Sequence, residues 1–313
     1  MEAFRSAVTP KRLLSLKVDV DTHDGMRDGV PRLLDIFRQE GVRATFFLSF
    51  GPDNAGKAIF NIIREKGFLK KMLKTNAPGL YGLRTILSGT LLPARPIATK
   101  FPDLVRQIEA EGHECEIHAW DHRTWQDHIE TMSPAEIETQ FRQAHNAYQD
   151  ILGHPAEAVA APSWKITEQV IAVEAKMGFT YASDLRDGPP CFLKTENGTL
   201  SPLQIPTTGP CLEELLTMGI KDEEAWISQI ADAAFEASFP VVALHAEVEG
   251  GPYTHFLKEL LKKIKSYSFE IVTLHEAARA LLKNRENIPT MTLQHIQLPG
   301  RAGWVSSSVR FPA

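Results

Sequence analysis

The sequence lacks several features that mark common classes of protein. It has three cysteines in 313 residues, Cys115, Cys191 and Cys211, and no CxxC pair, which excludes a disulfide-stapled fold, a zinc ribbon and a thioredoxin-type site. No apolar run approaches the ~20 residues of a membrane-spanning helix, and the first twenty residues lack the continuous apolar core of a signal peptide. We therefore expect free thiols and a cytoplasmic location.

The chain also lacks the basic excess of a general nucleic-acid binder. It has 34 Lys and Arg against 39 Asp and Glu, a net charge of −5, so we expect no nucleic-acid partner. The basic residues are unevenly distributed, because nine of them and a single acid, Glu65, lie between Lys57 and Lys100. That stretch has a net charge of +8, and the remaining 25 basic and 38 acidic residues leave −13 for the body of the chain.

Apolar, β-prone runs alternate with helical patterns over most of the chain. We expect strands at 13–20, 43–50, 113–118, 158–161, 180–183, 203–206, 241–246 and 269–274, and helices at 29–40, 102–111, 134–152, 167–177, 222–238 and 255–265. This alternation predicts βαβ units and a parallel sheet, and seven or eight such units favour an irregular (β/α) barrel. A doubly wound sheet is the alternative, although no GxGxxG follows an early strand.

The domain organisation follows from the same patterns. We expect a single catalytic domain over residues 1–313, with a basic amphipathic insertion at about 52–100 and an irregular tail from about 289. Within the tail, residues 300–304 have the composition of a loop that folds back on the body.

Acids and histidines fall at the ends of expected strands. Asp19 and Asp21 end the first strand, where side chains at i and i+2 lie on one face, and the carboxyl ends of parallel barrel strands form the active site. The alternative is that one of the two caps the following turn. His118 and His122 end the third strand at a spacing that can present both imidazoles to one ion. Two histidines and a carboxylate predict a catalytic site for zinc, iron, cobalt or manganese.

His245 ends the apolar strand at 241–246. Its position at a strand end, like that of the other candidates, favours a role in proton transfer. The alternative is a buried histidine bonded to a backbone carbonyl. We expect the other eight histidines to lie at the surface.

The combined pattern DVD, HxxxH and LHAE resembles the polysaccharide deacetylase (NodB-homology) family of metal-dependent carbohydrate esterases, over roughly residues 13–282. The resemblance implies an α/β fold of the distorted (β/α) barrel type and one divalent metal ion, with zinc, cobalt and manganese as candidates. It also implies roles for individual residues: Asp19 as the catalytic base, His245 as the general acid, and Asp21, His118 and His122 as the metal ligands.

Two positions depart from the family pattern. Val20 separates two aspartates that are adjacent in the family, and Ala160, ahead of Pro162, stands where the family has an arginine. The side chain that orients the base must then come from elsewhere. The candidates for orienting the base or contacting the substrate are Arg186, then Lys165, and also Trp164 and Glu247.

The strings DVDTHDG, HAWDH and HAEVEG are most similar to one branch of the family. That branch implies a deformylase acting on undecaprenyl-phosphate-linked 4-deoxy-4-formamido-L-arabinose, which gives the amino sugar lipid used to modify lipid A in polymyxin resistance. The alternative is an N-deacetylase or cyclic-amide hydrolase of the same fold, acting on a soluble or polysaccharide substrate. Such an enzyme is not expected to need the basic insertion.

The basic insertion interleaves apolar residues with Lys66, Lys70, Lys71 and Lys74. A basic amphipathic segment is typical of membrane-surface binding, and each Lys or Arg near an anionic leaflet contributes about 1 kcal/mol. A solvated helix packed by its apolar face is the alternative. With a lipid-linked substrate, we expect these lysines to face an anionic membrane and the protein to be peripheral on the inner face of the cytoplasmic membrane.

Overall fold

A parallel sheet forms the centre of the protein. The structure is a computed structural model that describes residues 12–57, 88–90 and 92–310. The sheet order is β10 (Val241–His245), β1 (Leu13–Val20), β2 (Thr45–Ser49), β5 (Glu114–Ala119), β6 (Ala158–Val159), β7 (Tyr181–Ala182), β9 (Leu203–Gln204). A further strand, β11 (Glu270–Val272), pairs in parallel with the first residues of β1.

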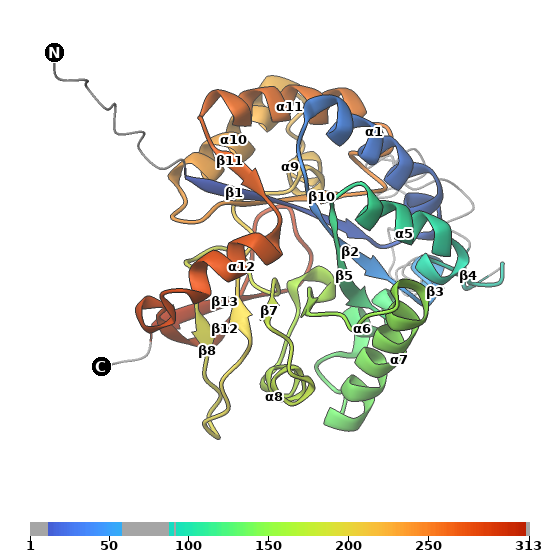
Figure 1. Cartoon of the computed structure of the whole chain (residues 1–313), viewed down its shortest axis with the longest axis vertical. Coiled ribbons are helices and arrows are strands. Elements are labelled where there is room, and N and C mark those ends of the chain that lie inside the picture. The colour runs from blue at the N-terminus through green and yellow to red at the C-terminus, as the bar shows by residue number, and fades with distance from the viewer. Residues whose placement is uncertain (1–11, 58–87, 91, 311–313) are drawn as a thin grey trace, which may run out of the picture.

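Helices connect the strands and surround the sheet (Figure 1). They are α1 (Val30–Glu40), α5 (Pro102–Ala110), α6 (His122–His128), α7 (Pro134–Leu152), α8 (Glu168–Met177), α9 (Leu212–Thr217), α10 (Glu223–Glu236), α11 (Thr254–Ser266) and α12 (Leu274–Leu282). α1 packs against α11, and α7 packs against α5 and α8. The predicted distorted (β/α) barrel is confirmed, in the form of a half-barrel of seven parallel strands.

β1 places a row of polar and charged side chains inside the half-barrel. Leu14, Leu16, Val18 and Val20 all belong to the main apolar core. The alternate residues, Ser15, Lys17 and Asp19, are buried polar side chains on the opposite face of the strand. Lys17 Nζ lies 5.4 Å from the centre of the Phe47 ring on β2. The polar face of β1 therefore points into the interior, and Asp19 lies near the carboxyl end of the strand.

α7 forms where the sequence predicts it. Ser133 Oγ accepts a hydrogen bond from the backbone N–H of Glu136, and the Glu136 carboxylate accepts one from the backbone N–H of Ser133, at 2.7 Å. This capping box satisfies two N–H groups that the first turn leaves unpaired. The helix ends at Leu152, where Gly153 adopts a left-handed conformation with φ +84°.

The C-terminal segment differs from its prediction. Instead of an irregular tail, β12 (Thr290–Ile296) and β13 (Val305–Arg310) form an antiparallel hairpin, and β12 also pairs with β8 (Phe192–Leu193). The prediction was wrong because Ser306, Ser307 and Ser308 provide little apolar alternation, so the strands depend on backbone pairing that periodicity does not reveal. The short helices α6 and α9 were missed for the same lack of pattern.

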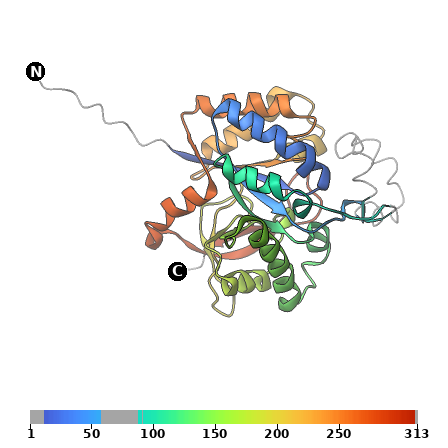
Figure 2. The ribbon, with the colours of Figure 1, turned by 45° about the vertical axis from the view of Figure 1, so that its right-hand side comes forward.

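The described part of the basic insertion is a short antiparallel pair, β3 (Pro52–Asp53) and β4 (Arg95–Pro96), which extends from the side of the sheet in Figure 2. Lys66, Lys70, Lys71 and Lys74 lie outside the described residues, so the expectation that they face a membrane stays a prediction. Among the helices that the structure describes, none has the length and apolarity needed to cross a bilayer.

Candidate active site

The predicted site residues meet at one edge of the sheet. Asp19 pairs in register with His245 between β1 and β10. His118 lies in β5, which is separated from β1 by β2, and His122 is the first residue of the following helix, α6. Because these strands are parallel, their carboxyl ends point the same way, and the side chains that follow them converge.

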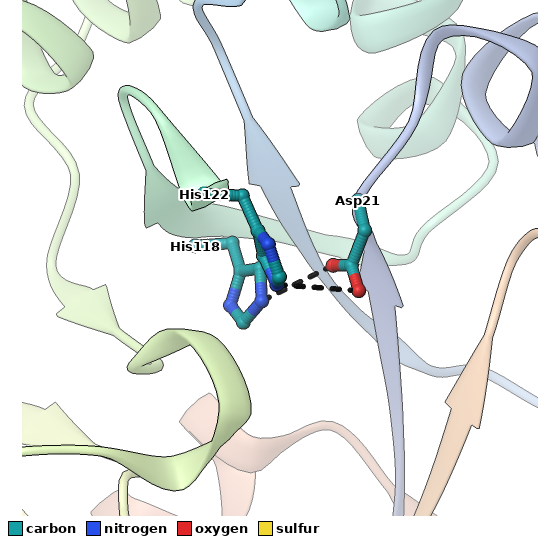
Figure 3. A group of neighbouring side chains, drawn as sticks. All are labelled: Asp21, His118 and His122. Atoms are coloured by element: carbon teal, nitrogen blue, oxygen red, sulfur yellow. Dashed lines mark ion pairs between the residues drawn. The ribbon is translucent and has the colours of Figure 1, made fainter. Parts of the chain in front are cut away.

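Asp21, His118 and His122 form a compact group (Figure 3). His118 Nε2 lies 3.2 Å from Asp21 Oδ1, and His122 Nε2 lies 3.3 Å from Asp21 Oδ2. The two imidazole rings are 5.1 Å apart between centres. The ligand atoms of all three residues are within 4.8 Å of one another, a separation that suits coordination of one ion.

The hydrogen bonding of His118 fits a metal ion. Its Nδ1 lies 2.7 Å from the carbonyl oxygen of Ala160, which only accepts, so Nδ1 carries the proton and Nε2 presents a lone pair. That lone pair faces a carboxylate oxygen of Asp21, which also offers lone pairs. A cation between two such acceptors removes their repulsion, and a carbonyl contact of this kind is the usual outer support of a metal-binding histidine.

The pKa values of this group favour the forms that bind a metal ion. Burial lowers the pKa of His122 to about 4, so its imidazole is neutral near pH 7. Burial alone would raise the pKa of Asp21, but His122 and His118 lower it well below its usual range. A neutral imidazole and an ionised carboxylate are the ligand forms that a divalent cation requires.

Glu247 holds the backbone at Asp21 through hydrogen bonds. Its Oε1 accepts hydrogen bonds from the backbone N–H of Asp21 at 2.9 Å, from that of Thr22 at 2.7 Å and from the Thr22 hydroxyl at 2.8 Å. Burial, together with the neighbouring Asp21, raises the pKa of Glu247 to about 8. Glu247 was predicted as a base-orienting or substrate-contacting residue, and in the structure it fixes the backbone at a candidate metal ligand.

Lys17 is the cation next to Asp19. Its Nζ lies 3.3 Å from Asp19 Oδ2 and donates a hydrogen bond to the carbonyl oxygen of Ser183 at 3.0 Å. Both side chains are buried, and burial lowers the pKa of Lys17 while Asp19 and Asp184 oppose that change. Asp19 Oδ1 has no hydrogen-bond partner among the described residues. One oxygen of the carboxylate is therefore held by a cation, and the other is free to accept a proton.

The two cations predicted for this position lie elsewhere. Arg186 forms a buried ion pair with Glu214, with 2.6 Å between Nη1 and Oε1, and Lys165 Nζ lies 4.9 Å from the centre of the Trp304 ring. Among the described residues, the ion pair of Asp19 is with Lys17. The sequence contains a signal for it, because Lys17 lies two residues before Asp19 in the first strand and therefore shares its face.

His245 has a carboxylate partner that the sequence did not indicate. Its Nδ1 lies 2.8 Å from Glu213 Oε1, in the first turn of α9. Burial alone would lower the pKa of His245, but the Glu213 carboxylate raises it well above its ordinary value. Trp164 contacts His245 edge to face, with 6.1 Å between ring centres, and is only 1% exposed. Trp164, predicted as a base-orienting or substrate-contacting residue, therefore supports the imidazole and offers little surface of its own.

Two of the histidines predicted at the surface are buried. His113 packs against Phe37 and Phe46, and its Nδ1 accepts a hydrogen bond from the backbone N–H of Ala44 at 3.1 Å. His23 Nδ1 lies 2.6 Å from the carbonyl oxygen of Pro96. Both contacts join segments distant in sequence, so local pattern did not reveal them.

Two curated relatives match this chain over most of its length. A protein of Shewanella sediminis (strain HAW-EB3), named "Probable 4-deoxy-4-formamido-L-arabinose-phosphoundecaprenol deformylase ArnD", is 34% identical over 295 residues, which cover 94% of this chain and 93% of that protein. A protein of the same name from Wigglesworthia glossinidia brevipalpis is 31% identical, with 90% of this chain and 97% of the relative covered.

The fold also has solved relatives. The crystal structure of a probable polysaccharide deacetylase from Pseudomonas aeruginosa PAO1 is similar to this chain, with a TM-score of 0.60 and 15% identity, and covers 88% of this chain and 92% of that one. The family model described as polysaccharide deacetylase matches residues 7–182, which is more than half of the chain. On this match and that of the two relatives, the chain belongs to the polysaccharide deacetylase family.

Proposed function

We propose that this chain is a metal-dependent amide hydrolase that removes the formyl group from undecaprenyl-phosphate-linked 4-deoxy-4-formamido-L-arabinose. The observation that carries the proposal is the meeting of Asp19, His245 and the Asp21–His118–His122 group at one edge of the half-barrel. The names of the two relatives support the substrate. The products would be formate and the amino sugar lipid used to modify lipid A in polymyxin resistance.

Asp21, His118 and His122 would hold one divalent ion. Zinc, cobalt and manganese all accept two imidazoles and a carboxylate, and three protein ligands leave positions open for water and substrate. When bound, the ion lowers the pKa of a water molecule and polarises the formyl oxygen. The support for this assignment is the lone pair of His118 Nε2 that faces the Asp21 carboxylate.

Asp19 would act as the general base. Its free Oδ1 accepts a proton from water as the water oxygen attacks the formyl carbon. Lys17 Nζ holds Oδ2 at 3.3 Å, so the two oxygens of the carboxylate have different roles. A positioned base of this kind contributes typically ~10²–10⁴-fold in rate.

His245 would act as the general acid. Its raised pKa keeps the imidazole protonated near neutral pH, and Glu213 orients it through Nδ1, so Nε2 is the nitrogen that donates. As the bond between the formyl carbon and the sugar nitrogen breaks, the nitrogen takes this proton and leaves as an amine. Base and acid then stand on neighbouring strands, since Asp19 and His245 are in register.

The proposal includes a membrane surface as a partner. The lipid tail of the substrate stays in the bilayer while the sugar enters the site, and Lys66, Lys70, Lys71 and Lys74 make the insertion basic. We expect binding to anionic liposomes that weakens with salt. Replacing these four lysines by glutamine should weaken it, whereas the matched change on α11, at Lys258, Lys262, Lys263 and Lys265, should not. Equal binding by both variants would contradict the assignment.

The function is tested by mass spectrometry of the formamido-arabinose polyprenyl phosphate after incubation with the metal-loaded protein. We expect the lipid to lose one formyl group and formate to appear in equal amount. An unchanged lipid, together with hydrolysis of an N-acetylated sugar or a cyclic amide, would contradict the proposal and favour the alternative activities of the fold.

A further inference from the structure

The tip of the C-terminal hairpin packs against α9 at the edge of the site. Gly300 has φ +78°, and a Cβ added there would lie 2.3 Å from the carbonyl oxygen of Glu214. Only glycine permits this approach of the two backbones. The contact fixes the position of the next residue, Arg301, whose backbone N–H bonds to the carbonyl oxygen of Leu298 at 3.3 Å.

Arg301 lies close to the residues that hold the general acid. Its Nη1 lies 2.8 Å from Glu214 Oε1 and 4.0 Å from Cys211 Sγ, and that sulfur is within 4.8 Å of ligand atoms of both Glu213 and His245. The guanidinium carbon lies 4.5 Å from the centre of the Trp164 ring, which itself contacts His245. One intervening side chain therefore separates Arg301 from His245.

The Glu214 carboxylate is shared by two arginines. Glu214 is already paired with the buried Arg186, with its two oxygens 2.6 and 3.0 Å from Nη1 and Nη2 of that residue. The same carboxylate receives Arg301, so one negative charge faces two guanidiniums. The neighbouring Glu213–His245 pair carries one charge of each sign and adds no net charge.

Arg301 also has donors that are free to bind a ligand. Within the described part of the chain, every side-chain hydrogen bond and ion pair of Arg301 starts from Nη1. Nε and Nη2 remain available, and the side chain is 19% exposed. These two N–H groups form a planar fork, which matches two oxygens of a phosphate group.

We propose that Arg301 binds the phosphodiester of the lipid-linked sugar. This inference rests on the proposed function, because the formamido group and the phosphate occupy opposite ends of one pyranose ring. An anion held by Arg301 would lie about one sugar from His245 and place the formyl nitrogen at the acid. The residue would thus select sugars that carry a phosphate, while the chemistry remains with Asp19 and His245.

The test compares two substrates that differ only in the phosphate. One is the formamido-arabinose on a short-chain prenyl phosphate, and the other is its methyl glycoside. We expect Arg301→Ala to lower kcat/KM for the phosphate-linked sugar at least tenfold more than for the methyl glycoside, mainly through KM, and Arg301→Lys to recover part of the loss. Arg106→Ala, which changes an exposed arginine paired with Asp103 on α5, is the matched control. Equal losses on both substrates would show a structural role through Trp164 and would overturn the proposal, as would no loss on either.

A binding measurement separates this inference from the proposed function. Titration of the short-chain prenyl phosphate alone should show at least tenfold weaker binding to Arg301→Ala than to wild type. This readout requires no turnover, so it stands even if the wild type releases no formate, a result that would contradict the proposed function. Equal affinity of the two proteins would overturn the assignment of Arg301.

Discussion

The pair formed by Glu213 and His245 allows a quantitative prediction. Glu213→Gln keeps the size of the side chain and a hydrogen-bond acceptor near His245 Nδ1, but removes the negative charge that lies 2.8 Å away. The carboxylate is the group that raises the pKa of His245 against the effect of burial. In the variant, therefore, the pKa of His245 must fall, and with it the fraction of general acid that is protonated at a given pH.

The size of the effect follows from the contact. An opposite charge within about 4–6 Å changes a pKa by about 1–3 pH units, and each unit corresponds to about 1.4 kcal/mol. Because only protonated His245 donates, the alkaline limb of the kcat profile should move to lower pH by this amount. At a pH above the wild-type pKa, the variant should be slower than wild type by about tenfold for each pH unit by which the pKa of His245 has fallen. Most of the variant's activity should return at lower pH.

The assay is formate release at saturating substrate between pH 5 and 10, with wild type, Glu213→Gln and a control. Glu223→Gln is the matched control, because Glu223 faces His255 at 3.9 Å on the surface, where solvent screens the pair. Its profile should coincide with that of wild type. A Glu213→Gln profile with an unmoved alkaline limb and a uniform loss of rate would refute the reasoning.

Three further predictions concern stability. Lys17→Met leaves the buried Asp19 carboxylate without its cation, so the free energy of unfolding measured with urea should fall by about 3–5 kcal/mol, and adding Asp19→Asn should recover part of it. Gly29→Ala would place a Cβ 2.0 Å from the carbonyl oxygen of Ala246. Calorimetry should therefore show a free energy of unfolding lower by about 1–3 kcal/mol, and an unchanged melting temperature would contradict this close contact. His113 has its pKa lowered to about 4 by burial, so the unfolded chain, with a pKa near 6.5, takes up the proton first and stability falls as pH drops from 6.5 to 4. In urea titrations, His113→Gln should remove up to about 3 kcal/mol of that pH dependence. If the free energy of unfolding of the variant changed with pH as that of wild type does, the role assigned to burial would be contradicted.

Much of the fold could be predicted because its long elements carry strong periodic signals. β1 has the predicted bounds, Leu13–Val20, since its apolar residues alternate with polar ones that enter the interior. The hairpin of β12 and β13 carries no such signal, because three successive serines occupy β13 and the pairing is made by the backbone. Two-residue strands such as β6 depend on their neighbours in the sheet, so their limits were overestimated.

The site residues likewise include some that the sequence could predict and one that it could not. Asp19, Asp21, His118 and His245 follow or end strands, and parallel topology alone brings such ends together. Strand alternation could also have predicted Lys17, because it lies two residues before Asp19 on the same face of β1. Glu213 was not, because a six-residue helix far from His245 in sequence carries it, and only the closure of the fold places it at the imidazole.

The most direct test of the account is a titration of metal-free protein with a divalent ion, in which bound metal and formate release are measured on the same samples. We expect activity to rise linearly and to saturate at one ion per chain. His118→Ala should bind no ion at this site, while Asp19→Asn should bind one ion and release almost no formate. Full activity in metal-free protein, or in metal-loaded Asp19→Asn, would contradict the central claim.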